Sequence, residues 1–403
     1  MSMRSPRGLI ALLLIGCGGS PGNLTDLAGN TGRHEVIAKA FGDPLPDLTA
    51  DEKARFDTGD FTFRRNHDAA SGAGPVMTGI ACLGCHDFPP AIGGSNQRLE
   101  TRFGRRNADG TFDELISLGG PLLQDQAIGR VASGFTFVPE KVPVEANVVT
   151  ARRTTPLFGL GLVDATPDAT FQAIAAWQKA HAPATAGRPA MVLDIPTQKT
   201  AVGKFGWKAA HPTLLQFNAD AFINEMGITN PLFPTENCPQ GDCTTLAQNP
   251  RADMNDPDGK SLNEAHDFVQ FLGPPPRLTT SGNGAGLFES VGCSACHVQT
   301  LVTGPSAVAA MDRVAFHPFS DFLLHDMGAL GDGVDQGDAK AAEMRTAPLW
   351  GVARQTRLLH DGRARTVSDA ILAHDGQGKP ARDRFAALSS ADQQALLAFI
   401  DTL

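Results

Sequence analysis

The sequence contains no tyrosine among its 403 residues, which removes one metal ligand and one side chain that can carry a radical. It also lacks any apolar run of about 18 residues, so a protein that spans a membrane several times is excluded. Positive charge is in deficit, with 34 Lys and Arg against 43 Asp and Glu, and a net charge of −9 argues against nucleic-acid binding. Hydrophobic residues at 42% are too many for a disordered chain, and the length fits two domains.

The N-terminus has the pattern of an export signal. Two arginines precede a short apolar run at positions 9–15, which is too short to cross a bilayer. The sequence Leu-Ile-Gly-Cys that ends at Cys17 resembles the bacterial lipoprotein signal, in which that cysteine is lipidated; a signal peptide with a chance cysteine is the alternative. We therefore expect a signal peptide over 1–16, a tether over 17–45, and a lipoprotein on the periplasmic side, anchored to the outer membrane.

Two CxxCH motifs carry the strongest chemical signal in the sequence, one at 82–86 and one at 293–297. Two cysteines at this spacing can bond both vinyl groups of one haem, and the adjacent histidine can ligate its iron. A thioredoxin-like pair does not need the histidine, and the CxxC halves of a zinc ribbon stand about 15–20 residues apart. The motifs predict two covalently bound haems c, attached through the residues Cys82, Cys85, His86, Cys293, Cys296 and His297.

Two further cysteines, Cys238 and Cys243, lie in a turn-rich loop. In an exported protein this spacing favours a short-range disulfide that closes the loop, and two free thiols are the alternative.

The segment Gly-Pro-Pro-Pro at 273–276 predicts a boundary between a first haem domain at 46–273 and a second at 277–403. A repeated pattern, R-T-x-P-L-aromatic-G, follows each CxxCH motif, beginning at Arg153 and at Arg345. The repeat indicates a duplicated haem domain. The two arginines could pair with haem propionates, or they could be solvated surface residues.

Helical periodicity is clear at 167–180 and at 389–403, and no strand-like alternation persists along the chain. The Gly-rich region 91–146 is long for a minimal cytochrome domain and is predicted to be an insertion of unknown role. The expected fold is mainly α, with two cytochrome c-like haem domains in tandem, long irregular loops, and this insertion in the first domain.

Potential sixth ligands to the iron are unevenly distributed. No His or Met lies between His86 and His181, so the first haem lacks a nearby sixth ligand. This predicts an open first haem and a closed second haem, although distant segments could also supply a ligand to the first, such as those of His67, Met77 and His211. The candidates after the second motif are Met311, His317, His325, Met327, Met344, His360 and His374.

Several long motifs resemble the di-haem oxidoreductase family of peroxidases, which is related to the bacterial di-haem cytochrome c peroxidases and to MauG. They are FGWKAAHPTLLQ at 205–216, EMGITNPLFPTENC at 225–238, RTAPLW at 345–350 and LLHDGRARTVSDAILAHDG at 358–376. The resemblance covers roughly residues 50 to 403.

By this resemblance Trp207 lies between the haems, while Gln216 and Glu225 line the peroxide pocket of the first haem. His374 stands where relatives supply the second haem's sixth ligand, which is Met in the peroxidases and Tyr in MauG. A chain without tyrosine cannot reproduce the MauG arrangement, so the resemblance implies two histidines on the second iron. His360 and His325 are expected beside the haem rather than on the iron, with His360 bonding a propionate.

The chemistry of peroxide cleavage supports this assignment, because a carboxyl group near the iron can move a proton between the two oxygens. Burial should raise its pKa toward the useful range. The alternatives are a surface carboxylate for Glu225, an ordinary polar helix residue for Gln216, and a core aromatic for Trp207.

The predicted function is therefore an exported peroxidase-type oxidoreductase that reduces hydrogen peroxide or a related oxidant. Its electrons would come from a small cytochrome, a cupredoxin or a membrane source. Two alternatives stay open: a non-catalytic di-haem electron carrier, and a MauG-like oxidase that acts on a partner protein. The acidic stretch at 253–259 does not fit the EF-hand pattern. It could hold Ca²⁺, as related peroxidases do between their domains, or it could be a solvated loop.

Overall fold

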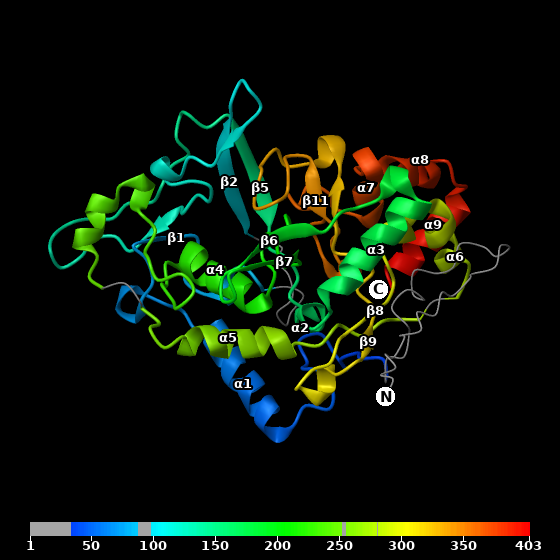
Figure 1. Cartoon of the computed structure of the whole chain (residues 1–403), viewed down its shortest axis with the longest axis horizontal. Coiled ribbons are helices and arrows are strands. Elements are labelled where there is room, and N and C mark those ends of the chain that lie inside the picture. Colours follow the sequence, from blue (N-terminus) through cyan, green and yellow to red (C-terminus); the bar gives the residue numbers. More distant parts are fainter. Residues whose placement is uncertain (1–33, 88–97, 252–254, 280) are drawn as a thin grey trace, which may run out of the picture.

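The computed structural model describes residues 34–87, 98–251, 255–279 and 281–403 (Figure 1). The predicted signal peptide 1–16, the lipidation site Cys17 and most of the predicted tether lie outside these residues. Two residues of the acidic stretch, Asp253 and Met254, also lie outside them.

Three helices surround the first CxxCH motif: α1 (Ala50–Arg64), α4 (Leu214–Met226) and α5 (Lys260–Phe271). A capping box between Thr49 and Glu52 starts α1. The helix packs against α5 at Gly59, where a Cβ atom would come within 2.2 Å of the Glu264 carbonyl oxygen. Phe63 of α1 also stacks near Phe268 of α5, with ring centroids 5.0 Å apart. The glycine therefore permits the close approach that brings these two helices beside the motif.

A second group of helices lies on the right-hand side of Figure 1, and residues of each line the cavity that contains the second motif. These helices are α6 (Gly284–Val291), α7 (Val367–Leu372), α8 (Lys379–Ala386) and α9 (Ser390–Ile400). The prediction of a C-terminal helix is confirmed, since the Ser389 side chain caps α9 and accepts a bond from the Asp392 amide. Leu396 and Ile400 of α9 are buried against Phe288 of α6.

The helix predicted at 167–180 is α3 (Asp168–His181), which follows the short α2 (Leu160–Asp164). Although α3 precedes the second motif by more than a hundred residues, it contacts that motif directly. Its buried Gln178 donates one bond to the Ala295 carbonyl and another to Asp321, over 2.8 and 2.7 Å. The second motif is thus supported by a helix from the first part of the chain.

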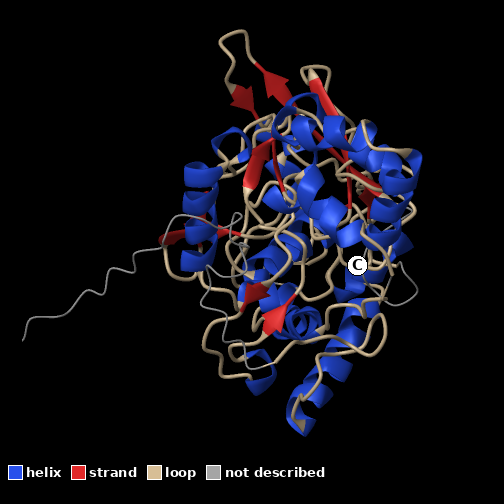
Figure 2. Ribbon diagram, turned by 90° about the vertical axis from the view of Figure 1, so that its right-hand side faces the viewer, coloured by secondary structure: helices blue, strands red, loops and turns tan. Residues whose placement is uncertain are grey.

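The structure corrects the expectation that no strands would persist. Strand β2 (Leu99–Arg106) pairs with β5 (Val148–Arg153) and with β3 (Phe112–Asp113) in a three-stranded antiparallel sheet. Only Leu99 and Phe103 of β2 are strongly apolar, and Arg105 stands on the face that they share, so the alternation is too short to predict a strand. Figure 2 shows the short strands set among helices and long loops.

The remaining strands form antiparallel pairs: β1 (Val76–Met77) with β4 (Gln126–Ala127), β6 (Ala190–Asp194) with β7 (Lys199–Gly203), β8 (Leu301–Val302) with β9 (Ala315–Phe316), and β10 (Leu324–Asp326) with β11 (Glu343–Arg345).

The main hydrophobic core contains residues from both sides of the Gly-Pro-Pro-Pro segment. Phe158 and Phe171 lie in this core together with Phe322 and Trp350. The segment itself is packed, because the Gly273 amide donates to the Asp43 carbonyl and the Pro274 carbonyl accepts from the Ala38 amide. Residues 273–276 therefore do not form an exposed tether between separate cores.

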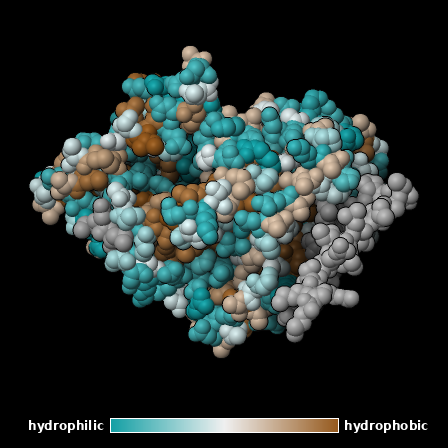
Figure 3. Space-filling model, in the orientation of Figure 1, coloured by the Kyte–Doolittle hydropathy of each residue, from teal (hydrophilic) through white to brown (hydrophobic). Residues whose placement is uncertain are grey.

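On the face shown in Figure 3, hydrophilic residues cover most of the surface and hydrophobic residues form separate patches. None of the helices in the described ranges is both long enough and apolar enough to cross a bilayer.

Candidate functional site

Two cavities each contain one CxxCH motif. The first encloses about 1270 Å³ of space between its lining atoms and the second about 1680 Å³, part of it open to solvent in both cases. The motifs form the same turn: the His86 amide donates to the Cys82 carbonyl and the His297 amide to the Cys293 carbonyl, each over 2.9 Å. This turn directs both thiols and the imidazole of each motif into one cavity.

In the first cavity the motif is buried and uncharged. Burial raises the pKa of the Cys82 and Cys85 thiols to about 12, and both cysteines are free. Burial lowers the pKa of His86 to about 3, so the imidazole is neutral. Its Nδ1 atom is buried without a hydrogen-bond partner among the described residues. A neutral imidazole can ligate iron, and two free thiols beside it are the groups that a covalently bound haem would use.

Glu225, at the end of α4, faces the same cavity. Its Oε2 atom accepts a hydrogen bond from the Thr78 hydroxyl. Burial, followed by the negative charge of Glu100, raises the pKa of Glu225 to about 8, so it holds a proton at neutral pH. The predicted peroxide-pocket carboxyl group is therefore in the cavity.

The cavity also contains Glu100 and Arg102 of β2, which the sequence analysis missed. Arg102 donates to both carboxylate oxygens of Glu100, over 3.0 Å from Nε and 3.4 Å from Nη2. Residues two apart on a strand face the same side, and this spacing could have identified the pair. That inference requires a strand at 99–106, which the sequence analysis did not predict. The region 91–146 thus supplies charged residues to the first cavity.

His211 lies in the first cavity as well. Its Nε2 atom is 3.5 Å from the Asp220 carboxylate, and its Nδ1 atom is buried without a partner in the described part of the chain. His211 is therefore the histidine that the fold brings to the first cavity from a distant segment.

The second cavity contains two oriented histidines. The Nδ1 atom of His297 lies 2.8 Å from the Phe319 carbonyl, and that of His374 lies 2.7 Å from the Ala370 carbonyl. A carbonyl accepts only from an N–H, so these contacts place the proton on Nδ1 and leave the lone pair on Nε2. Burial lowers the pKa of both, that of His297 to about 4. Both rings line the cavity as neutral bases, each with an Nε2 lone pair that could ligate a metal.

Two more histidines, His325 and His360, also line the second cavity. His325 contacts Asp321 over 3.0 Å and the Cys296 sulfur over 3.6 Å. These three side chains could geometrically hold a metal ion, but Cys296 belongs to the CxxCH motif. The Nε2 atom of His360 is buried without a partner among the described residues, and burial lowers its pKa to about 4.

Trp207 lines both cavities. Its indole N–H donates to the Arg153 carbonyl over 2.6 Å, and its own carbonyl accepts from the Arg345 amide over 2.9 Å. The two arginines that begin the repeated motif thus hold the tryptophan between the cavities.

Arg153 and Arg345 are buried, with 5% of each residue exposed, which excludes the solvated alternative. Within the described ranges neither forms an ion pair with a carboxylate: Arg153 donates to the Gln355 side chain, and Arg345 donates to the carbonyls of Gly206 and Thr346. Burial lowers the pKa of each to about 10. A buried cation without a counter-ion is costly, so these positions suit an anionic group.

The structure places the Gln216 side chain away from both cavities. Its amide accepts from the Ile195 amide and donates to the Leu193 carbonyl, and it does not line either cavity. Positions 216 and 225 lie nine residues apart on the continuous helix α4, a rotation of about 900° that puts them on opposite sides. Gln216 is therefore held by the backbone of residues 193 and 195, on the side of α4 opposite Glu225.

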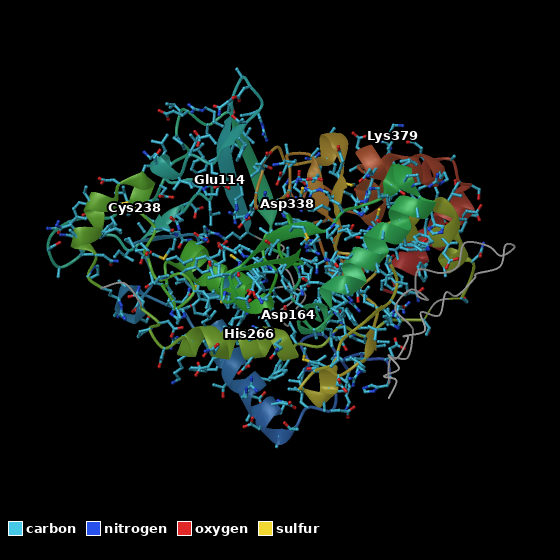
Figure 4. All side chains as sticks on the ribbon, in the orientation of Figure 1. Glu114, Asp164, Cys238, His266, Asp338 and Lys379 are labelled. Atoms are coloured by element: carbon cyan, nitrogen blue, oxygen red, sulfur yellow. A yellow bond between two sulfur atoms is a disulfide. The ribbon has the colours of Figure 1, made fainter. Side chains whose placement is uncertain are left out.

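Two loop predictions have different outcomes. Cys238 and Cys243 form the predicted disulfide, in a loop at one end of the molecule (Figure 4). In the acidic stretch, the Asp256 carboxylate accepts from the amides of Ser261 and Leu262 and so caps α5. Both oxygens of Asp256 thus accept backbone hydrogen bonds, which favours the interpretation of this stretch as a solvated loop rather than a calcium site.

A family model described as "Di-haem oxidoreductase, putative peroxidase" matches residues 140–403, well over half of the chain. The chain belongs to this family. The matched residues include the second CxxCH motif, whereas the first motif and the Glu100–Arg102 pair of this di-haem oxidoreductase lie upstream of them.

Two solved structures resemble the di-haem oxidoreductase chain over nearly its whole length, each at 13% identity. One is the hydrazine synthase of Kuenenia stuttgartiensis pressurised with xenon, with a TM-score of 0.37 and 99% of this chain and 100% of that chain covered. The other is a MauG-like protein associated with microbial copper homeostasis, with a TM-score of 0.38 and 91% and 94% covered. A search of curated proteins found no match.

The residues of both cavities fit the haem groups that the family name implies. Each cavity offers a neutral motif histidine and the motif's cysteines, none of which is in a disulfide. In the described part of the chain Arg153 and Arg345 bond only uncharged groups, which is the environment that a haem propionate would complete.

Proposed function

We propose that this di-haem oxidoreductase holds one covalently bound haem c in each cavity and reduces hydrogen peroxide, or a related oxidant, in the first. Electrons would be relayed through the second cavity, and the balanced reaction is H₂O₂ + 2 e⁻ + 2 H⁺ → 2 H₂O. The observation that carries the proposal is the buried, protonated carboxyl of Glu225 beside the first motif, set against the paired imidazoles of His297 and His374 in the second.

His86 would hold the iron of the first group, and His297 with His374 the iron of the second. The thiols of Cys82, Cys85, Cys293 and Cys296 would form the covalent links. When bound, haem supplies one-electron redox chemistry and, where one side of the iron is free, a place for peroxide.

Glu225 would move the proton that peroxide cleavage requires. Its carboxyl is buried, bonded to the Thr78 hydroxyl, and protonated at neutral pH, so it can donate a proton to a departing oxygen and recover one afterwards. Trp207 would couple the two cavities, because its ring lines both and its position is fixed by two backbone hydrogen bonds.

The proposal also includes two cytochrome c-like domains, at 46–273 and 277–403, that share the main core. It further includes export, lipidation at Cys17 and anchoring to the outer membrane on the periplasmic side. The electron donor would be a small cytochrome, a cupredoxin or a membrane source.

The variant Glu225→Gln tests this function, because the amide keeps the side chain's shape but cannot exchange the proton. We expect peroxide turnover by the haem-loaded protein to fall about 100-fold or more. Glu114→Gln is the matched control: Glu114 is a half-buried carboxyl near β2 whose pKa is also raised by burial, but it does not line the cavity (Figure 4). Full activity in Glu225→Gln, or an equal loss in both variants, would contradict the proposal.

One observation favours the electron-carrier alternative. If His211 ligates the first iron in place of its contact with Asp220, both sites would be closed and no peroxide could bind. Electron paramagnetic resonance of the oxidised and half-reduced protein separates the two functions. A high-spin first site in the half-reduced state supports the peroxidase, and two low-spin sites in every state support the carrier.

A further inference from the structure

Glu225 does not stand alone in the first cavity, because Glu100 of β2 faces it and the two side chains share a hydrogen bond. Two carboxyl groups can share a hydrogen bond only when one of them carries a proton. Glu100 comes from residues upstream of the family match, so it is a feature of the part of this chain that the family model does not describe.

Arg102 decides which member of the pair is ionised. Its guanidinium donates to both oxygens of Glu100 and leaves Glu225 without a direct contact of this kind. Burial opposes ionisation of Glu100, but the charge and hydrogen bonds of Arg102 outweigh it and lower the pKa of Glu100. The arrangement is therefore an ordered row of a cation, a carboxylate and a carboxylic acid, with the acid nearest the motif thiols.

We propose that Glu100, anchored by Arg102, is a positioning residue that keeps the pair's single proton on Glu225. The inference rests on the proposed function, since it explains how Glu225 starts as a proton donor. When Glu225 gives its proton to a substrate oxygen, the pair is left with two negative charges, and that repulsion favours the uptake of a replacement proton.

The groups that face Glu225 come from each element packed around it. They are the Thr78 hydroxyl after β1, the motif thiols of Cys82 and Cys85, and Glu100 and Arg102 of β2. Asp220 of α4 and Arg152 of β5 act one step further away, on Arg102 and on Glu100 respectively. Removing the two β2 charges should thus shift the titration of Glu225 in opposite directions.

Infrared difference spectroscopy of the haem-loaded protein can follow the carboxylic acid band, which Glu225→Gln would assign by removing it. Glu100→Gln deletes the negative charge beside Glu225, so we expect the midpoint of the band to fall by about one pH unit or more. Arg102→Gln deletes the positive charge, so the midpoint should rise. Glu100→Asp keeps the charge and should retain most of the original midpoint; it also provides the test if Glu100→Gln does not fold.

Asp113→Asn is the matched control, because Asp113 lies on β3, pairs with Arg105 of β2, and does not line the cavity. It should leave the midpoint unchanged. Unchanged midpoints in Glu100→Gln and Arg102→Gln, or shifts in the same direction, would overturn the inference. Opposite shifts in a protein without peroxide turnover would uphold the carboxyl pair and reject the proposed function, so the two failures are distinguishable.

Discussion

The two cavities begin from the same CxxCH turn and differ in what the rest of the chain brings to face it. In the first cavity, β2 and α4 contribute a carboxyl pair and an arginine. In the second, α7 and the residues after it bring His374 into a mainly apolar cavity that already contains His297. The same CxxCH turn therefore stands in two different environments, because the facing elements decide whether the cavity contains a carboxyl pair or a second imidazole.

The largest expected effect is the loss of one haem. Replacing Cys82 and Cys85 by alanine should abolish covalent attachment in the first cavity only, and replacing Cys293 and Cys296 should abolish it in the second only. A pyridine haemochrome assay should find about half of the covalent haem in each double variant. If both double variants lost all haem while remaining folded, the cavities would not be independent sites.

The next largest effect is a change of spin state at the second cavity. His374→Ala removes one of its two oriented imidazoles, so the low-spin signal of that site should become high-spin in electron paramagnetic resonance spectra. His211→Ala should leave both signals unchanged. A change of spin state in His211→Ala instead would mean that the first cavity is the closed one.

A smaller effect concerns pH. Burial and Glu100 raise the pKa of Glu225 to about 8, far above the usual value for glutamate of about 4.3, so Glu225 is the acid below this pKa and loses its proton above it. Turnover that needs this proton should stay level below pH 7 and fall about tenfold per unit well above pH 8. Steady-state rates across this range provide the measurement. A rate that rises through pH 8 would show that Glu225 works only as a base.

The smallest expected effect is a loss of stability, without a loss of peroxide turnover, when Gln216 is replaced. Gln216→Leu removes two buried backbone contacts, so urea denaturation should show a loss of about 1–3 kcal/mol in the free energy of unfolding. The peroxide rate should not change, which is the reverse of the pattern expected for Glu225→Gln. A large loss of rate with unchanged stability would return Gln216 to the active site.

The sequence alone allowed helices α3 and α9 and the disulfide to be predicted, because each depends on short spacings or local caps. It did not reveal β2, whose charges occupy both faces, and so it missed Glu100 and Arg102. The position of Trp207 on both cavities depends on contacts with Arg153 and Arg345, which are distant in sequence. The orientation of Gln216 was not predictable either, because it depends on α4 running unbroken from Leu214 to Met226, and no helix was predicted there.

The shared core has a consequence for modularity. Phe322 and Phe171 lie 6.2 Å apart between ring centroids, and Trp350 lies close against Gly159, although residues 273–276 separate the members of each pair in the chain. A fragment that ends at 276 would leave Phe158 and Phe171 exposed to water, and a fragment that begins there would do the same to Phe322 and Trp350. Because apolar residues from both sides of 273–276 bury one another, we expect that neither fragment would fold as an independent unit.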